Sequence, residues 1–148
     1  MKQMIRFLLW GVVFSYLNAG FILFPSKDKR IEELFNKNLR IIETACSPSQ
    51  YRKTNIFTTL IVKDLPDAIA YCHKKANGFV IAFDTAYLER ILSDLEKDQV
   101  MMHELVHCVF DEEHFSDPKH FMAEFFEEIP KETYEIQVEE YLKQKCQK

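Results

Sequence analysis

Two histidines four positions apart constrain this chain more than any other feature. His103 and His107 enclose Glu104 in the pentapeptide HELVH. In an α-helix, residues four apart lie on one face, one turn above each other, so both imidazoles can reach a single zinc ion. Glu104 then lies beside the pair, where its carboxylate can act on a metal-bound water without taking a coordination position. The pattern predicts a zinc-binding helix with Glu104 as general base.

The residues around the pentapeptide indicate that its helix lies in a protein core. We expect a helix from about Lys97 to Phe110, and most of its other side chains are apolar: Met101, Met102, Leu105, Val106, Val109 and Phe110. Buried histidines need partners, because an unpaired polar group in a core costs free energy. The alternative to a metal site is therefore a pair of core histidines with ordinary hydrogen bonds.

A third metal ligand is expected on the carboxyl side of the helix. A catalytic zinc usually has three protein ligands and leaves one position for water. His114 ranks first, because the helix would end near Asp111 and return the chain toward the metal. A carboxylate ligand would be closer to the thermolysin class, and the alternatives are Asp111, His120, Glu124, Glu127 and Glu128. His73 is expected to be structural or exposed.

The segment HELVHCVFDEEHFSDPKHFM resembles the zinc site of the metzincin metallopeptidases, especially the matrixin pattern. In that pattern a proline and the methionine of the Met-turn follow the third histidine, as Pro118 and Met122 follow His114 here. The resemblance extends over residues 103–122. It implies Glu104 as general base, Met122 as an apolar floor under the metal, and three zinc ligands: His103, His107 and His114.

Two departures from the family pattern concern the end of the helix. The interval between His107 and His114 is one residue longer than in the family, and the glycine that lets the chain turn is missing. We expect Asp111 to take the left-handed conformation instead, because aspartate tolerates it better than most residues.

The remaining periodicities predict an α+β fold, with a small mixed or antiparallel sheet packed against helices. The expected helices are Lys29–Ala45, Ala86–Leu95, Lys97–Phe110 with HELVH, and Glu132–Lys145. The expected strands are Asn55–Val62, Ala68–His73 and Phe79–Phe83, the last two forming a hairpin with an Asn77-Gly78 turn. Together with the resemblance, this layout implies a minimal zincin-like domain.

An uncharged run from Phe7 to Phe24 precedes this domain. As a helix it would span about 27 Å, close to the roughly 30 Å of a bilayer core. It predicts a membrane anchor or a secretory signal with a cleavage site at Leu17-Asn18-Ala19, and the anchor is favoured because the apolar run continues past that site. We assign residues 1–28 to the anchor or signal and residues 29–148 to the zincin-like metallopeptidase domain. The protein is expected in the cell envelope, membrane-anchored or secreted.

Charge and cysteine spacing exclude other classes. With 19 Lys and Arg against 23 Asp and Glu, the net charge is −4, so no basic excess favours nucleic acid as a partner. The four cysteines form no CxxC pair: Cys46, Cys72, Cys108 and Cys146. They predict neither a zinc cluster nor a redox motif, and free buried thiols and one or two disulfides both remain open.

The predicted activity is zinc-dependent hydrolysis of peptide bonds. Its expected partners are a peptide or protein substrate and a membrane bound through the N-terminal segment. We expect an edge strand over Phe79–Phe83 to align an extended substrate, and Tyr87 and Tyr134 are candidates to stabilise the oxyanion. The alternative is a non-catalytic, membrane-anchored envelope protein with a structural metal site that acts as a binding module. A third reading is a metallohydrolase acting on a non-peptide amide such as a cell-wall crosslink.

Overall fold

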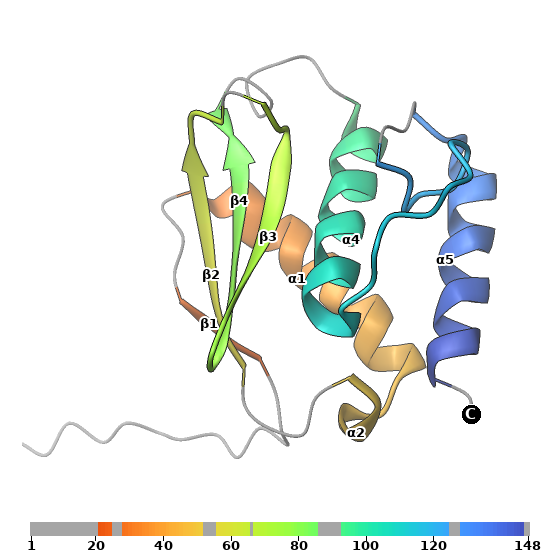
Figure 1. Ribbon diagram of the computed structural model, residues 1–148, viewed down its shortest axis with the longest axis horizontal. Helices are drawn as coiled ribbons and strands as arrows, with labels where there is room; N and C mark the ends of the chain where they lie inside the picture. The colour runs from red at the N-terminus through yellow and green to blue at the C-terminus, as the bar shows by residue number, and fades with distance from the viewer. Residues whose placement is uncertain are drawn as a thin grey trace, which may run out of the picture.

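The computed structural model describes residues 21–24, 28–51, 56–65, 67–85, 93–124 and 128–146. It is an α+β domain, as predicted, in which a small sheet lies against helices (Figure 1). Its elements are, in chain order, β1 (Phe21–Phe24), α1 (Lys29–Ala45), α2 (Pro48–Tyr51), β2 (Ile56–Lys63), β3 (Ala70–Lys75), β4 (Gly78–Asp84), α4 (Asp94–Phe110) and α5 (Lys131–Cys146).

The sheet is mixed, with strand order β1-β2-β4-β3. β1 and β4 both pair in parallel with β2, and β3 pairs antiparallel with β4. The predicted hairpin is confirmed, but its turn lies one residue earlier than expected, because Lys75 pairs with Gly78 around Ala76 and Asn77. The expectation that Phe79–Phe83 forms an edge strand is wrong. Those residues are all buried, as is typical of a central strand covered on both faces.

The uncharged N-terminal run contributes one strand to the sheet. Its last four residues form β1, which pairs with β2 from Phe21↔Ile56 to Phe24↔Thr59. Residues 7–20 lie outside the described residues, so the membrane anchor or signal stays a prediction. Within the described ranges, no helix combines the length and the apolar character needed to cross a bilayer.

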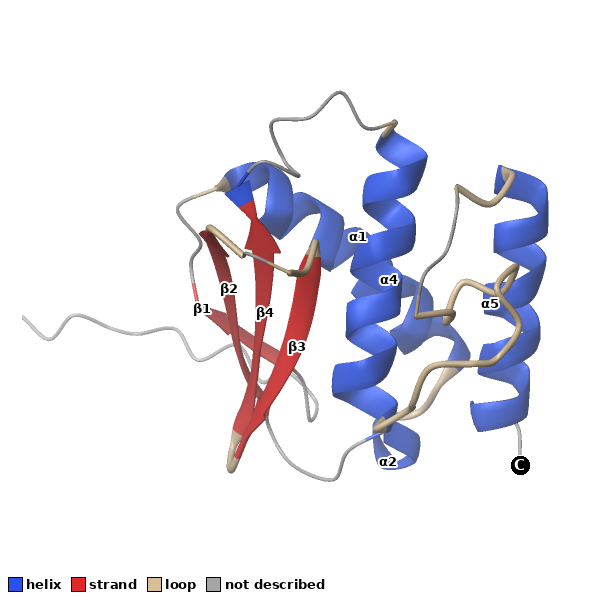
Figure 2. Cartoon of the chain, turned by 45° about the horizontal axis from the view of Figure 1, so that its top comes forward, coloured by secondary structure: helices blue, strands red, loops and turns tan. Residues whose placement is uncertain are grey.

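The helices form two further layers beside the sheet. α1 and α4 pack against each other, and α4 also packs against β3. α5 lies on the far side of α4, with the loop that follows α4 between them (Figures 1 and 2). α1 buries one face, with side chains at helical spacing: Ile31, Phe35, Leu39 and Ile42. α4 is buried on most of its surface because it has neighbours on both sides.

α4 begins three residues before the expected Lys97. Ser93 caps it in a capping box, in which the Ser93 hydroxyl accepts from the Glu96 N–H at 3.0 Å and the Glu96 carboxylate accepts from the Ser93 N–H at 2.8 Å. Most of the helix predicted over Ala86–Leu95 falls on residues 86–92, outside the described residues. Its last residue, Leu95, belongs to α4.

All four cysteines are paired in disulfides. Cys46–Cys146 joins the end of α1 to the end of α5, with a Cα–Cα distance of 4.9 Å and a sequence separation of 100. Cys72–Cys108 joins β3 to α4, with a Cα–Cα distance of 5.7 Å. One bridge therefore ties α5 to the domain, and the other ties the edge of the sheet to the helix that carries HELVH.

Candidate metal centre

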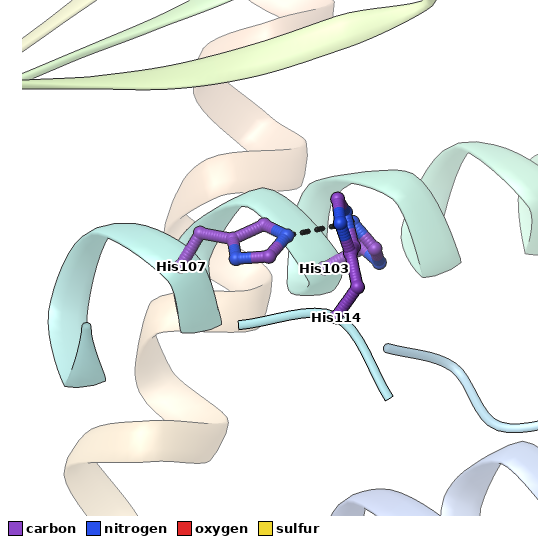
Figure 3. A group of neighbouring side chains, drawn as sticks. All are labelled: His103, His107 and His114. Carbon is purple, nitrogen blue, oxygen red and sulfur yellow. Dashed lines mark hydrogen bonds between the residues drawn. The ribbon is translucent and has the colours of Figure 1, made fainter. Parts of the chain in front are cut away.

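α4 presents His103 and His107 on one face, as the four-residue spacing predicts (Figure 3). His103 is only 6% exposed, whereas His107 is half-buried and borders a cleft. The two ring centroids are 4.5 Å apart. The helix therefore supplies two converging imidazoles, one deep in the protein and one nearer to solvent.

Asp111 ends α4 and turns the chain back toward these histidines. It has φ 59° and ψ 35°, the left-handed conformation predicted for it, and it is the one non-glycine residue with positive φ in the described part of the chain. A left-handed residue after the last helical turn reverses the direction of the backbone. His114 is thereby returned to the helix face, and its ring lies 4.6 Å from that of His107 and 5.2 Å from that of His103.

The three histidines form a group that could hold a metal ion, since one ring nitrogen from each lies within 4.8 Å of the others. The Nε2 atoms of His103 and His107 are 2.9 Å apart, and those of His103 and His114 are 3.2 Å apart. Figure 3 shows the three rings turned toward one another. The three residues predicted as ligands are thus brought together.

The hydrogen bonds of the Nδ1 atoms of His103 and His107 determine which ring nitrogens face the metal position. His103 Nδ1 donates to the Phe121 carbonyl at 2.8 Å, and His107 Nδ1 donates to the Glu112 carbonyl at 2.6 Å. A carbonyl oxygen only accepts, so both Nδ1 atoms carry the proton, and in the neutral rings both Nε2 atoms carry a lone pair. Two lone pairs that face each other at 2.9 Å repel unless a cation lies between them, so this arrangement fits a metal ion.

Burial keeps His103 in the neutral form that binds metals. Desolvation, with a smaller contribution from the neighbouring histidines, lowers its pKa from 6.5 to about 4, against the opposing effect of its hydrogen bond to Phe121. Desolvation likewise lowers the pKa of His107. Since a metal ligand must be a deprotonated imidazole, both shifts favour metal binding.

Glu104 is buried beside the cluster, with an exposed fraction of 7%. Desolvation raises its pKa from 4.5 to about 7, partly offset by a hydrogen bond from the backbone N–H of Cys72 on β3. It lines a cleft of about 340 Å³ together with His107 and His114; the lining residues are Ala70, Tyr71, Cys72, Lys74, Glu104, His107, Glu112 and His114. The carboxylate therefore faces the same space as the metal position.

The alternative ligands that the structure describes lie elsewhere. The Asp111 side chain is 86% exposed and pairs with Lys74, and His120 stacks on Phe115 with ring centroids 4.5 Å apart. Glu128 accepts from the Ser93 hydroxyl. Glu124 is exposed, Glu127 lies outside the described residues, and His73 is exposed on β3, as expected.

Two other predicted residues have clear positions. Met122 is completely buried in the core, next to Phe121, whose carbonyl holds His103. The hydroxyl of Tyr134 donates to the Asp98 carbonyl at 3.4 Å, and Tyr134 is not among the residues that line the cleft. This position removes the reason to consider Tyr134 for oxyanion stabilisation. Tyr87 lies outside the described residues.

Sequence reasoning missed the groups that orient the site. They are the Cys72 N–H and the carbonyls of Phe121 and Glu112. Backbone groups leave no mark in a sequence, so no pattern could have identified them.

The chain matches no protein-family model and no curated protein.

Removing the imidazole of His114 tests the ligand whose spacing departs from the expected pattern. We expect His114→Ala, equilibrated with one equivalent of Zn²⁺, to bind metal more than about 100-fold more weakly than wild type, because loss of a ligand costs more than the roughly 10- to 100-fold of an outer hydrogen bond. His120→Ala is the matched control and should keep its metal. Metal content after gel filtration measures both, and equal retention in the two variants would exclude His114 as a ligand.

Proposed function

We propose that this chain is a zinc-dependent metallopeptidase with Glu104 as its general base. One observation carries the proposal: three imidazoles converge beside a buried carboxylate that opens on the same cleft. His107, His114 and Glu104 line that cleft, and His103 completes the histidine group. This is the arrangement needed to bind a metal ion and to manage the proton of an attacking water.

The donor set favours zinc. Zinc accepts imidazole nitrogens readily, whereas Mg²⁺ and Ca²⁺ prefer oxygen ligands. A structural zinc site usually has four protein ligands, and a catalytic one has three. In the described part of the chain, the group contains His103, His107 and His114 with no fourth member. A three-ligand site supports the enzyme over a binding module with a structural metal.

The chemistry divides between the metal and the protein. When bound, zinc would supply Lewis acidity, which polarises a carbonyl and makes water a better nucleophile. Glu104 takes the proton of the attacking water at a carboxylate oxygen and delivers it to the leaving amine. The Cys72 N–H favours the charged form of that carboxylate. The outer hydrogen bonds of His103 and His107 keep both rings aimed at the metal.

β3 is the strand best placed to align a substrate. It pairs with β4 on one side and, among the described residues, with no strand on the other. Because successive N–H groups of a strand point in opposite directions, those of Ala70 and Lys74 point the same way as the Cys72 N–H that reaches Glu104. An extended peptide can add to this edge by backbone pairing. β3 therefore takes the role that the sequence suggested for Phe79–Phe83.

The two disulfides support an oxidising compartment, where such bonds persist. Together with the uncharged residues 7–20 that precede β1, they favour a protein of the cell envelope, anchored to the membrane or secreted. In that location a zinc ion and an extracellular or periplasmic polypeptide substrate are both accessible.

Metal removal tests the function directly. We expect the purified protein to contain about one zinc per chain, to cleave members of a peptide library, to lose cleavage on dialysis against a chelator and to recover it with Zn²⁺. The chelated protein should keep its fold, because two disulfides and a continuous hydrophobic core hold the described elements together. Full metal occupancy without cleavage of any peptide would contradict the proposal and favour the binding module. Release of fragments from cell-wall material alone would favour the non-peptide amide.

A further inference from the structure

Two polar side chains on α5 lie behind the metal centre, outside the residues that line the cleft. Gln137 and Tyr141 are one helical turn apart, so they share a face of α5. Tyr141 is buried, with an exposed fraction of 4%. Each hydrogen-bonds to a residue whose own carbonyl holds one of the two helix histidines, so each stands one step from a metal ligand.

Gln137 fixes the loop segment that holds His103. Its Oε1 accepts from the Phe121 N–H at 3.0 Å, and its Nε2 donates to the Lys119 carbonyl at 2.9 Å. The Phe121 carbonyl in turn accepts from His103 Nδ1 at 2.8 Å. The Gln137 amide therefore binds the loop at Lys119 and at Phe121, and the carbonyl of Phe121 orients the imidazole of His103.

Tyr141 acts in the same way on the segment that holds His107. Its hydroxyl donates to Glu112 Oε2 at 2.9 Å, and Lys145 pairs with the same oxygen. The Glu112 carbonyl accepts from His107 Nδ1 at 2.6 Å. The Tyr141 ring also packs edge-on against that of Phe121, with centroids 5.7 Å apart. α5 thus supports the hydrogen bonds that the Nδ1 atoms of His103 and His107 make to the loop carbonyls.

We propose that Gln137 and Tyr141 are positioning residues that pre-organise His103 and His107 for metal binding. The inference rests on the proposed metal site. Without these contacts the Phe121 and Glu112 carbonyls gain freedom, and the two imidazoles must be ordered at the moment of binding, which weakens affinity. α5 itself is held by the disulfide between Cys46 and Cys146. The helix therefore serves as a rigid support for a site that it does not line.

The test measures zinc affinity in single variants. Tyr141→Phe removes one oxygen and keeps the packed ring, and Gln137→Met removes both hydrogen bonds of the amide at similar volume. Because each residue acts through the group that holds the imidazole, we expect each variant to bind Zn²⁺ up to about 10-fold more weakly than wild type in competition with a chromophoric chelator, the lower end of the effect of a direct partner. The matched control is Tyr134→Phe, a buried tyrosine on the same helix whose hydroxyl contacts the Asp98 carbonyl.

Stability is measured alongside affinity to separate positioning from a general loss of structure. Urea unfolding of the metal-free proteins should show Tyr141→Phe and Tyr134→Phe to be similarly stable, with only the former impaired in zinc binding. Equal zinc affinity in Tyr141→Phe, Gln137→Met and the control would overturn the positioning role and leave the metal site intact. A wild-type protein that binds no zinc would overturn the metal site itself, and the positioning role with it.

Discussion

Replacing Glu104 by glutamine is expected to lower peptide cleavage by about 10²- to 10⁴-fold, the usual contribution of a general base. The amide cannot accept the proton of the attacking water. Its oxygen can still accept from the Cys72 N–H, and its volume matches that of the buried carboxyl, so the fold and the zinc content should be unchanged. Initial rates on a cleaved peptide, with metal analysis of the same samples, measure the effect.

The control for this variant is Glu124→Gln. Glu124 is an exposed carboxylate outside the cleft, and its replacement should change neither zinc content nor cleavage. It also tests one of the alternative ligands suggested by the sequence. Cleavage by the Glu104 variant at the wild-type rate would exclude a base role for Glu104, whatever the metal content. Loss of zinc from that variant would indicate that Glu104 is a metal ligand.

Removal of the disulfide between Cys46 and Cys146 is expected to cause the largest loss of stability. This bridge closes a loop of 100 residues, and loop entropy alone predicts that the Cys46→Ser, Cys146→Ser double variant loses about 4.7 kcal/mol of its free energy of unfolding. Denaturant titration under non-reducing conditions gives this value. A loss below about 1 kcal/mol would show that the bridge adds little to the packing of α1 and α5.

The second disulfide provides a matched comparison. Cys72–Cys108 spans 36 residues, so its removal should cost roughly 1 kcal/mol less stability than removal of the longer bridge. Its effect on cleavage should be greater, because it holds β3 against α4 at the point where the Cys72 N–H reaches Glu104. The two double variants therefore separate a bridge that stabilises the fold from one that also holds the cleft together.

The local elements were predictable because their signals are local. The helical spacing of apolar residues marks α1 over Lys29–Ala45, and the apolar run around HELVH marks the buried α4. The left-handed Asp111 was also predictable, since a helix that ends without a glycine turns at a residue that tolerates positive φ. Hydrogen bonds within a helix or turn link residues close in sequence, so residue types alone indicate them.

The order of strands and the pairing of cysteines could not be predicted from local patterns of residue types. Four cysteines allow three connectivities, and nothing local distinguishes Cys46–Cys146 from the others. The apolar run in β4 fits an edge or a centre until β2 is seen to pair with it. Both properties depend on contacts between segments distant in the chain.

The sequence by itself determined that His103, Glu104 and His107 share one helix and that His114 can return to it, because a period of 3.6 residues and a single turn decide both. Only the tertiary structure decided which groups surround them: a β3 N–H at the carboxylate, and two carbonyls at the imidazoles with α5 behind them. Those groups are mainly backbone atoms brought together by packing across the domain, and every residue type carries the same backbone.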